Sequence, residues 1–93
     1  MNSVNKLLTV QKLAQEVLKN NFDLDTLPRW VNKPMFIEDM IKNFVKVIMG
    51  AIENCDKYVN FDVQLYPIKP KNGECNILSS YTSIAISEEL CEL

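Results

Sequence analysis

The 93-residue chain contains no histidine and only two glycines. Without histidine, the Ser-His and Cys-His catalytic pairs and the His-containing zinc sites are excluded. Two isolated glycines cannot build a phosphate-binding loop or a dinucleotide-binding fingerprint. Neighbouring carboxylates fall at expected helix caps or solvated turns, whereas acid–base catalysis needs one of them buried. The three pairs are Asp23/Asp25, Glu38/Asp39 and Glu88/Glu89. We therefore expect no enzymatic activity, no cofactor and no metal.

The chain also lacks a charge excess, a long apolar run and a CxxC motif. A formal net charge of -2 differs from the basic composition typical of nucleic-acid-binding domains. The longest stretch without a polar side chain, VIMGAI, is too short for a signal peptide or a membrane helix. Three cysteines, an odd number, favour reduced thiols, so we expect a cytoplasmic protein without a membrane partner. Cys55 and Cys75 are predicted to be small core residues, and Cys91 part of a tail.

The composition is that of a globular chain. Its apolar fraction of 47% is far above that of disordered proteins, and its length predicts a single domain over residues 1–93. Lysine, asparagine and isoleucine are frequent, and Arg29 is the single arginine. AT-rich codons favour this trio, which suggests a low-GC genome or one of its viruses.

Two stretches have the 3.6-residue periodicity of amphipathic helices, over residues 3–20 and from Pro34 to about Cys55. The connection at 21–34 is expected to contain a short helical turn around Pro28–Val31, with Asn32 as a possible cap of the second helix. The DLDTL segment within it matches an EF-hand only at its first two ligands, so a local Asx turn is the better interpretation.

After the second helix the apolar period changes from 3.6 to 2. The segment YVNFDVQL predicts a strand with one solvated face, and PKNGE at 70–74 predicts a hairpin turn. In the return strand the apolar parity slips, which predicts a bulge or a short break near Ser79–Ser80. Ser87 is a candidate cap for a final acidic turn. The predicted fold is α+β: two long helices with a short connecting helix, followed by an antiparallel β-hairpin.

The second helix has an unusually wide apolar face. Its apolar residues fill about 180° of the helical wheel, whereas a surface helix of a small domain typically buries a stripe of roughly 100°. Either this helix is central in the fold, or part of its arc contacts a second copy of the chain. A two-stranded hairpin offers little cover for two such helices. We therefore predict a homodimer whose interface contains Phe36, Met40, Phe44, Val47 and Ala51.

By elimination, the sequence predicts a small protein-binding inhibitor or adaptor that acts by occlusion. Phage-encoded inhibitors of bacterial defence, anti-CRISPR proteins among them, are often small acidic domains, and the chain is similar to them in this class property alone. The candidate contacts combine the solvated strand face with residue types common in binding hot spots. They are Arg29, Trp30, Asn60, Asp62, Gln64, Tyr66 and Tyr81.

Two other functions remain open. The order of helices and hairpin is also that of a winged-helix DNA-binding regulator, although the outward face of the second helix carries three acidic and two basic residues. We therefore do not expect nucleic acid as a partner. A small-ligand-sequestering oligomer would instead need a polar pocket between subunits.

Overall fold

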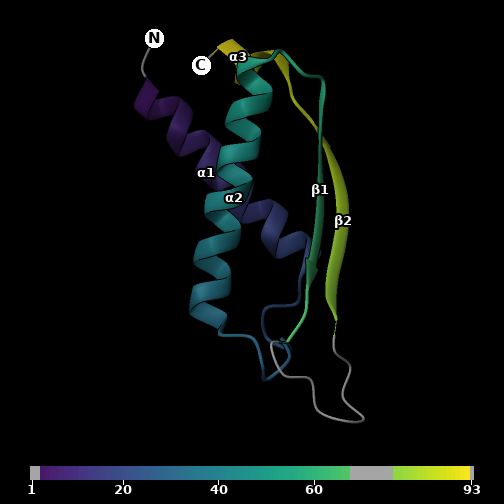
Figure 1. Cartoon of the computed structure of the whole chain (residues 1–93). Coiled ribbons are helices and arrows are strands. Elements are labelled where there is room, and N and C mark those ends of the chain that lie inside the picture. Colours follow the sequence, from purple (N-terminus) through teal and green to yellow (C-terminus); the bar gives the residue numbers. More distant parts are fainter. Residues whose placement is uncertain (1–2, 68–76, 93) are drawn as a thin grey trace.

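The computed structural model describes residues 3–67 and 77–92 (Figure 1). Two long helices, an antiparallel pair of strands and a short C-terminal helix follow one another along the chain, which confirms the predicted α+β class. The elements are α1 (Ser3–Asn21), α2 (Lys33–Glu53), β1 (Tyr58–Leu65), β2 (Leu78–Ala85) and α3 (Glu88–Glu92). The molecule is elongated, with principal extents of 52 × 22 × 19 Å.

The connection between the two long helices is a pair of turns. The Asp25 N–H donates to the Asp23 carboxylate at 3.0 Å, which confirms the predicted Asx turn. The helical turn expected near Pro28 is instead a single hydrogen-bonded turn, closed by Val31 N–H and the Pro28 carbonyl at 3.0 Å. Proline suits either structure because its fixed φ is compatible with both a turn and a first helical position. The short helix of the fold is α3, where Ser87 Oγ caps the Leu90 N–H at 3.1 Å as predicted.

Helix α2 begins and ends with well-defined caps. The side chain of Asn32 accepts a hydrogen bond from Met35 N–H at 3.2 Å, which confirms it as the N-cap. At the other end, Cys55 N–H bonds to Ile52 O and Asp56 N–H bonds to Ala51 O, the pattern of a Schellman motif. Cys55 occupies the left-handed position of this motif with φ 57°. It is exposed, so its prediction as a core residue is wrong, because the helix ends before its side chain can turn inward.

The hairpin pairs β1 with β2 over eight consecutive residue pairs, from Tyr58–Ala85 to Leu65–Leu78. Neither a bulge nor a break interrupts this register, so the irregularity predicted near Ser79–Ser80 is wrong. The apolar parity slips for another reason: Ile77 and Tyr81 project outward and are 51% and 67% exposed. The inner face of β2 includes hydroxyl side chains in place of apolar ones. One of them, Ser80, donates a hydrogen bond from Oγ to Asn21 Oδ1 at 3.3 Å. The turn predicted at 70–74 and Cys75 lie outside the described residues.

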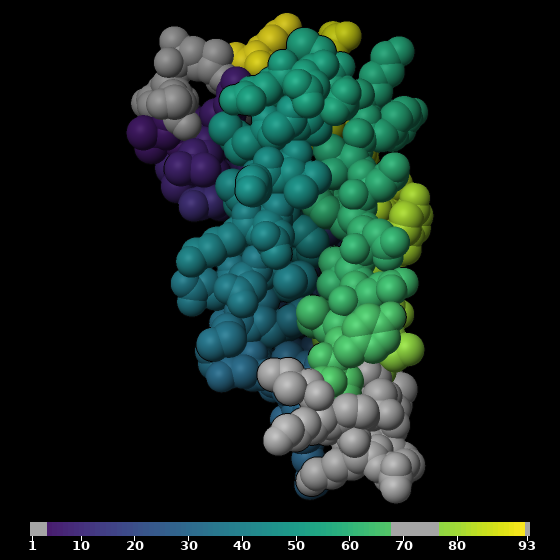
Figure 2. All heavy atoms as spheres, in the orientation of Figure 1, coloured from purple at the N-terminus to yellow at the C-terminus, as the bar shows by residue number. Residues whose placement is uncertain are grey.

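Both long helices pack on the inner face of the hairpin, α2 on β1 and α1 on β2, and α1 crosses α2 obliquely (Figure 1). The fully buried Ile48 and Val10 mark the centre of the resulting core. An edge-to-face pair of Phe44 and Phe61, with ring centroids 4.7 Å apart, joins α2 to β1. The space-filling view shows α2 and β1 next to each other along the length of the molecule (Figure 2). Cys91 is half-buried against the core, not in a free tail.

Candidate functional site

The outer face of the hairpin collects the candidate contact residues. Since successive side chains of a strand point to opposite sides, one face of β1 packs on the helices and the other meets solvent. We call the solvent-facing set the hairpin outer face. It consists of Tyr58, Asn60, Asp62, Gln64 and Tyr66 together with Ser79, Tyr81 and Ser83.

All three tyrosines of the chain lie on this face. Tyr58 and Tyr81 are each 67% exposed, and Tyr66 is 61% exposed. Aromatic side chains of soluble proteins are mostly at least half-buried. Three exposed tyrosines on one face therefore distinguish this face as a candidate binding surface. At about 3.4 Å per residue, Tyr58 and Tyr66 lie about 27 Å apart along the strand, with Tyr81 between them. The tyrosines therefore follow the whole length of the hairpin.

The remaining side chains of the face are small and polar. Cross-strand pairs place Asn60 opposite Ser83, and Gln64 opposite Ser79. Asp62 is the only charged residue of the two strands and lies opposite Tyr81. The Tyr66 hydroxyl donates to Gln64 Oε1 at 3.2 Å, so one end of the face is ordered by its own contacts. Such a surface offers hydrogen bonds and aromatic area with little net charge.

Of the two candidate residues in the connection, Trp30 lies beside one end of this face. Arg29 is exposed, whereas Trp30 is half-buried and its indole N–H has no hydrogen-bond partner among residues 3–67 and 77–92. Trp30 and Tyr66 line the same hollow of about 180 Å³, together with Met35 and Asp39. The structure thus brings Trp30 next to Tyr66, with the tryptophan partly packed into the fold, whereas Arg29 does not line this hollow.

The residues predicted for a dimer interface lie mostly inside the chain. Phe36, Met40, Phe44 and Ala51 are between 3% and 9% exposed. They belong to the core of the chain itself: Phe36 packs against Phe22 of the connection and Phe44 against Phe61 of β1, and α2 contacts both α1 and β1. Val47, at 43% exposed, is the one residue of the five that a second molecule can reach in this structure. The wide apolar arc of α2 is therefore explained largely by its central position.

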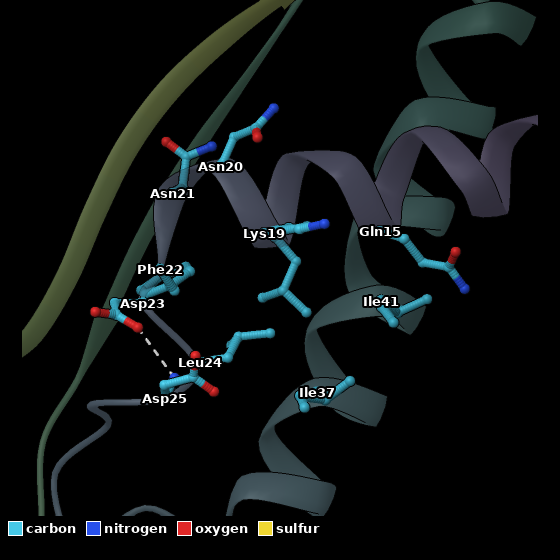
Figure 3. A pocket seen from close by; sticks show the side chains of 11 residues that line it. Gln15, Lys19, Asn20, Asn21, Phe22, Asp23, Leu24, Asp25, Ile37 and Ile41 are labelled. Carbon is cyan, nitrogen blue, oxygen red and sulfur yellow. Dashed lines mark hydrogen bonds between the residues drawn. The ribbon is translucent and has the colours of Figure 1, made fainter.

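A larger hollow, of about 800 Å³, lies where α1 ends near the first turns of α2 (Figure 3). Leu24, Ile37 and Ile41 point toward one another across it, and polar side chains lie around its rim. The rim carboxylates have local roles: Asp23 closes the Asx turn, and Asp25 forms an exposed ion pair with Lys33 at 3.8 Å. No trio of cysteine, aspartate or glutamate suited to a metal occurs in the described ranges. The hollow is therefore an apolar surface with a polar rim whose two carboxylates take part in contacts of the connection.

Sequence reasoning missed three members of the hairpin outer face, namely Tyr58, Ser79 and Ser83. Tyr58 precedes the alternating apolar run, and the serines lie where the parity slip suggested a bulge. The pairing register identifies them. It places Ser79 opposite Gln64 and Ser83 opposite Asn60, which are predicted contacts, and Tyr58 opposite the exposed Ala85. Without the register, a serine in a strand carries no information about its face.

Comparison of the chain with protein-family models, characterised proteins and solved structures finds no significant match. Among the described helices, none is both long enough and apolar enough to cross a membrane.

Proposed function

We propose that the protein is a non-enzymatic binding module that recognises another protein through the hairpin outer face. The observation that carries this proposal is the exposure of all three tyrosines on that face, each above 60%. Tyrosine buries a large contact area at a low entropic cost and is enriched in binding hot spots and antibody paratopes. Serine and asparagine, which surround the tyrosines here, supply the adaptable hydrogen bonds of such surfaces.

The proposed mechanism is occlusion, as an inhibitor or adaptor. The face is long, narrow and backed by a packed core, so it can cover a working surface of its target without refolding. Rigid preformed surfaces keep more of their contact energy as affinity because little conformational entropy is lost on binding. A phage- or mobile-element-encoded inhibitor is consistent with the frequent lysine, asparagine and isoleucine of the sequence, and the proposal includes action as a homodimer.

The charge of the face argues against nucleic acid as the target. Phosphate binding requires several lysines or arginines, whereas the two strands carry a single charged residue, Asp62. A winged helix also needs a helix between α1 and α2, and residues 22–32 of the structure form turns. A polar protein surface is the better fit to this face.

The proposal is tested with a triple variant, Tyr58→Ser, Tyr66→Ser and Tyr81→Ser, in a comparative pull-down from lysates of the host cells in which the protein is produced. The matched control is Lys12→Ser, Glu16→Ser and Asn43→Ser, which changes three exposed helix residues and leaves the net charge unaltered. We expect a target retained by wild type and control but lost from the tyrosine variant. Hot-spot losses of about 2 kcal/mol or more correspond to at least about 30-fold weaker binding.

Equal capture by all three proteins, or no capture at micromolar concentration, would contradict the proposal. A fluorescent 20-mer DNA, single- or double-stranded, serves as the probe for the alternative function. We expect no binding at 0.15 M salt. Binding that falls steeply with salt would instead support nucleic acid recognition.

A further inference from the structure

Within residues 3–67 and 77–92, β1 and β2 form a two-stranded sheet, so each strand has one edge without a neighbouring strand. The Ile86 N–H donates to the Lys57 carbonyl at 2.8 Å, and the register places these two residues opposite each other. In an antiparallel ladder, such hydrogen-bonded pairs alternate with pairs whose backbone groups point away from the partner strand. The backbone groups that point outward from β2 therefore belong to Ser79, Tyr81, Ser83 and Ala85.

These outward groups have no partner in the part of the chain that the structure describes (3–67 and 77–92). The corresponding groups on the edge of β1 belong to Tyr58, Asn60, Asp62 and Gln64. Open edges of this kind are ready templates for another strand, and proteins usually protect them with charges, prolines or bulges. The sequence of β2, LSSYTSIA, contains no charge and no proline, and its eight pairs with β1 run without a bulge.

Charge distinguishes the two edges as sites for self-association. If β1 paired with a second β1 about a twofold axis, the two Asp62 carboxylates would approach each other near the middle of the strand, which is unfavourable. Pairing of β2 with a second β2 brings no charges together. A twofold axis at Thr82 places Ser79 opposite Ala85 of the second copy and Tyr81 opposite its Ser83. All four outward residues of each strand then take part, giving about eight interchain hydrogen bonds.

We propose that two copies of this chain join through the β2 edges, forming a continuous four-stranded antiparallel sheet. The helices then cover one side of this sheet, and the two hairpin outer faces form one surface with six tyrosines. The inference rests on the edge and its charge pattern. It extends the proposed binding function by making the recognition surface a property of two chains, and it differs from the α2 interface expected from the sequence.

The test compares two proline variants by light scattering over dilutions that bracket micromolar. Ser83→Pro removes an outward N–H from the β2 edge, and Asn60→Pro removes one from the β1 edge at the paired position. Neither N–H takes part in the hairpin ladder, so both variants are expected to keep the fold. We expect twice the 10.7 kDa chain mass for wild type and Asn60→Pro, and the single-chain mass for Ser83→Pro.

A second pair of variants, Ser83→Lys and Asn60→Lys, covers the case in which proline disturbs folding. In the proposed dimer the two copies of residue 83 lie near the twofold axis, whereas residue 60 lies on β1, outside the interface. Only Ser83→Lys therefore brings two lysines together, and its dimer dissociation constant should be at least tenfold higher than that of wild type. Amide hydrogen exchange of wild type should show protection at Tyr81 and Ser83 but not at Asn60 and Asp62. A monomeric wild type overturns the proposal. A dimer that survives both Ser83 substitutions, or leaves these amides unprotected, assigns the interface elsewhere, with Val47 on α2 as the first candidate. Mass is measured without any target, so this outcome is independent of the tyrosine pull-down.

Discussion

At the residue scale, Cys55 combines a strained backbone conformation with a structural role at the end of α2. Cys55 adopts the left-handed conformation that ends α2, with φ 57°. Residues other than glycine pay a steric cost of about 1–2 kcal/mol there because Cβ approaches the backbone. The Schellman hydrogen bonds of Cys55 and Asp56 hold this conformation in place. The chain therefore keeps a strained residue at the junction between its longest helix and the hairpin.

Replacing Cys55 by glycine is expected to stabilise the fold. The relief of steric strain exceeds the added entropy of the unfolded chain, so we expect a gain of about 0.5–1 kcal/mol. Urea unfolding followed by circular dichroism measures this difference. Cys55→Ala is the matched control, because alanine keeps Cβ and should gain nothing. An equal gain from both variants would locate the effect in the thiol, not in the backbone.

At the element scale, α2 contains a second position at which a substitution is expected to increase stability, Gly50. Glycine within a helix costs about 1 kcal/mol relative to alanine because it retains more freedom in the unfolded state. A Cβ placed on Gly50 meets no atom within 4 Å in this structure, so a methyl group fits without displacement. The half-buried site near the C-terminal end of α2 thus carries a helix-weakening residue without a packing reason.

Gly50→Ala is therefore expected to raise the free energy of unfolding by about 0.8–1 kcal/mol. Thermal unfolding should show the midpoint rising by several degrees, since a domain of this size shifts about 4–8 °C per kcal/mol. Gly50→Ser should gain about half as much, following the intrinsic helix preferences. Loss of stability in both variants would mean that the space beside Gly50 is needed, for example by a second molecule.

The helices and strands differ in how well the sequence alone predicts them. Both helices and β1 follow from periodicity, because burial on one side leaves a repeated apolar pattern. The sequence could not show what covers the wide apolar arc of α2. An apolar periodicity is the same whether α1 and β1 or a second chain buries those residues. The strand β2 misled the prediction because Tyr81 and Ile77 are exposed, and outward aromatic and aliphatic residues resemble a register shift. The solvent-facing residues of β1 were predictable from alternation, whereas the outward position of Ser79 and Ser83 required the pairing register.

At the scale of the whole molecule, association should couple to stability. If the native state is a dimer of β2-paired chains, mass action makes unfolding depend on protein concentration. A 100-fold increase contributes about 1.4 kcal/mol per chain, which corresponds to a rise of about 5–10 °C in the unfolding midpoint. Scanning calorimetry at two concentrations measures this shift. Ser83→Pro should unfold at a midpoint independent of concentration, and a constant midpoint for wild type would argue against a dimer.

The strict alternation of β1 separates the residues that hold the fold from those that meet solvent. Val59 and Phe61 point into the core, while their neighbours Asn60 and Asp62 have no role in it. Selection can thus alter one side of the sheet while the other stays unchanged. If the hairpin outer face binds a target as proposed, a lineage carrying this domain can follow changes in that target by replacing outer-face residues alone. The hairpin is for the same reason a scaffold in which these positions can be randomised together.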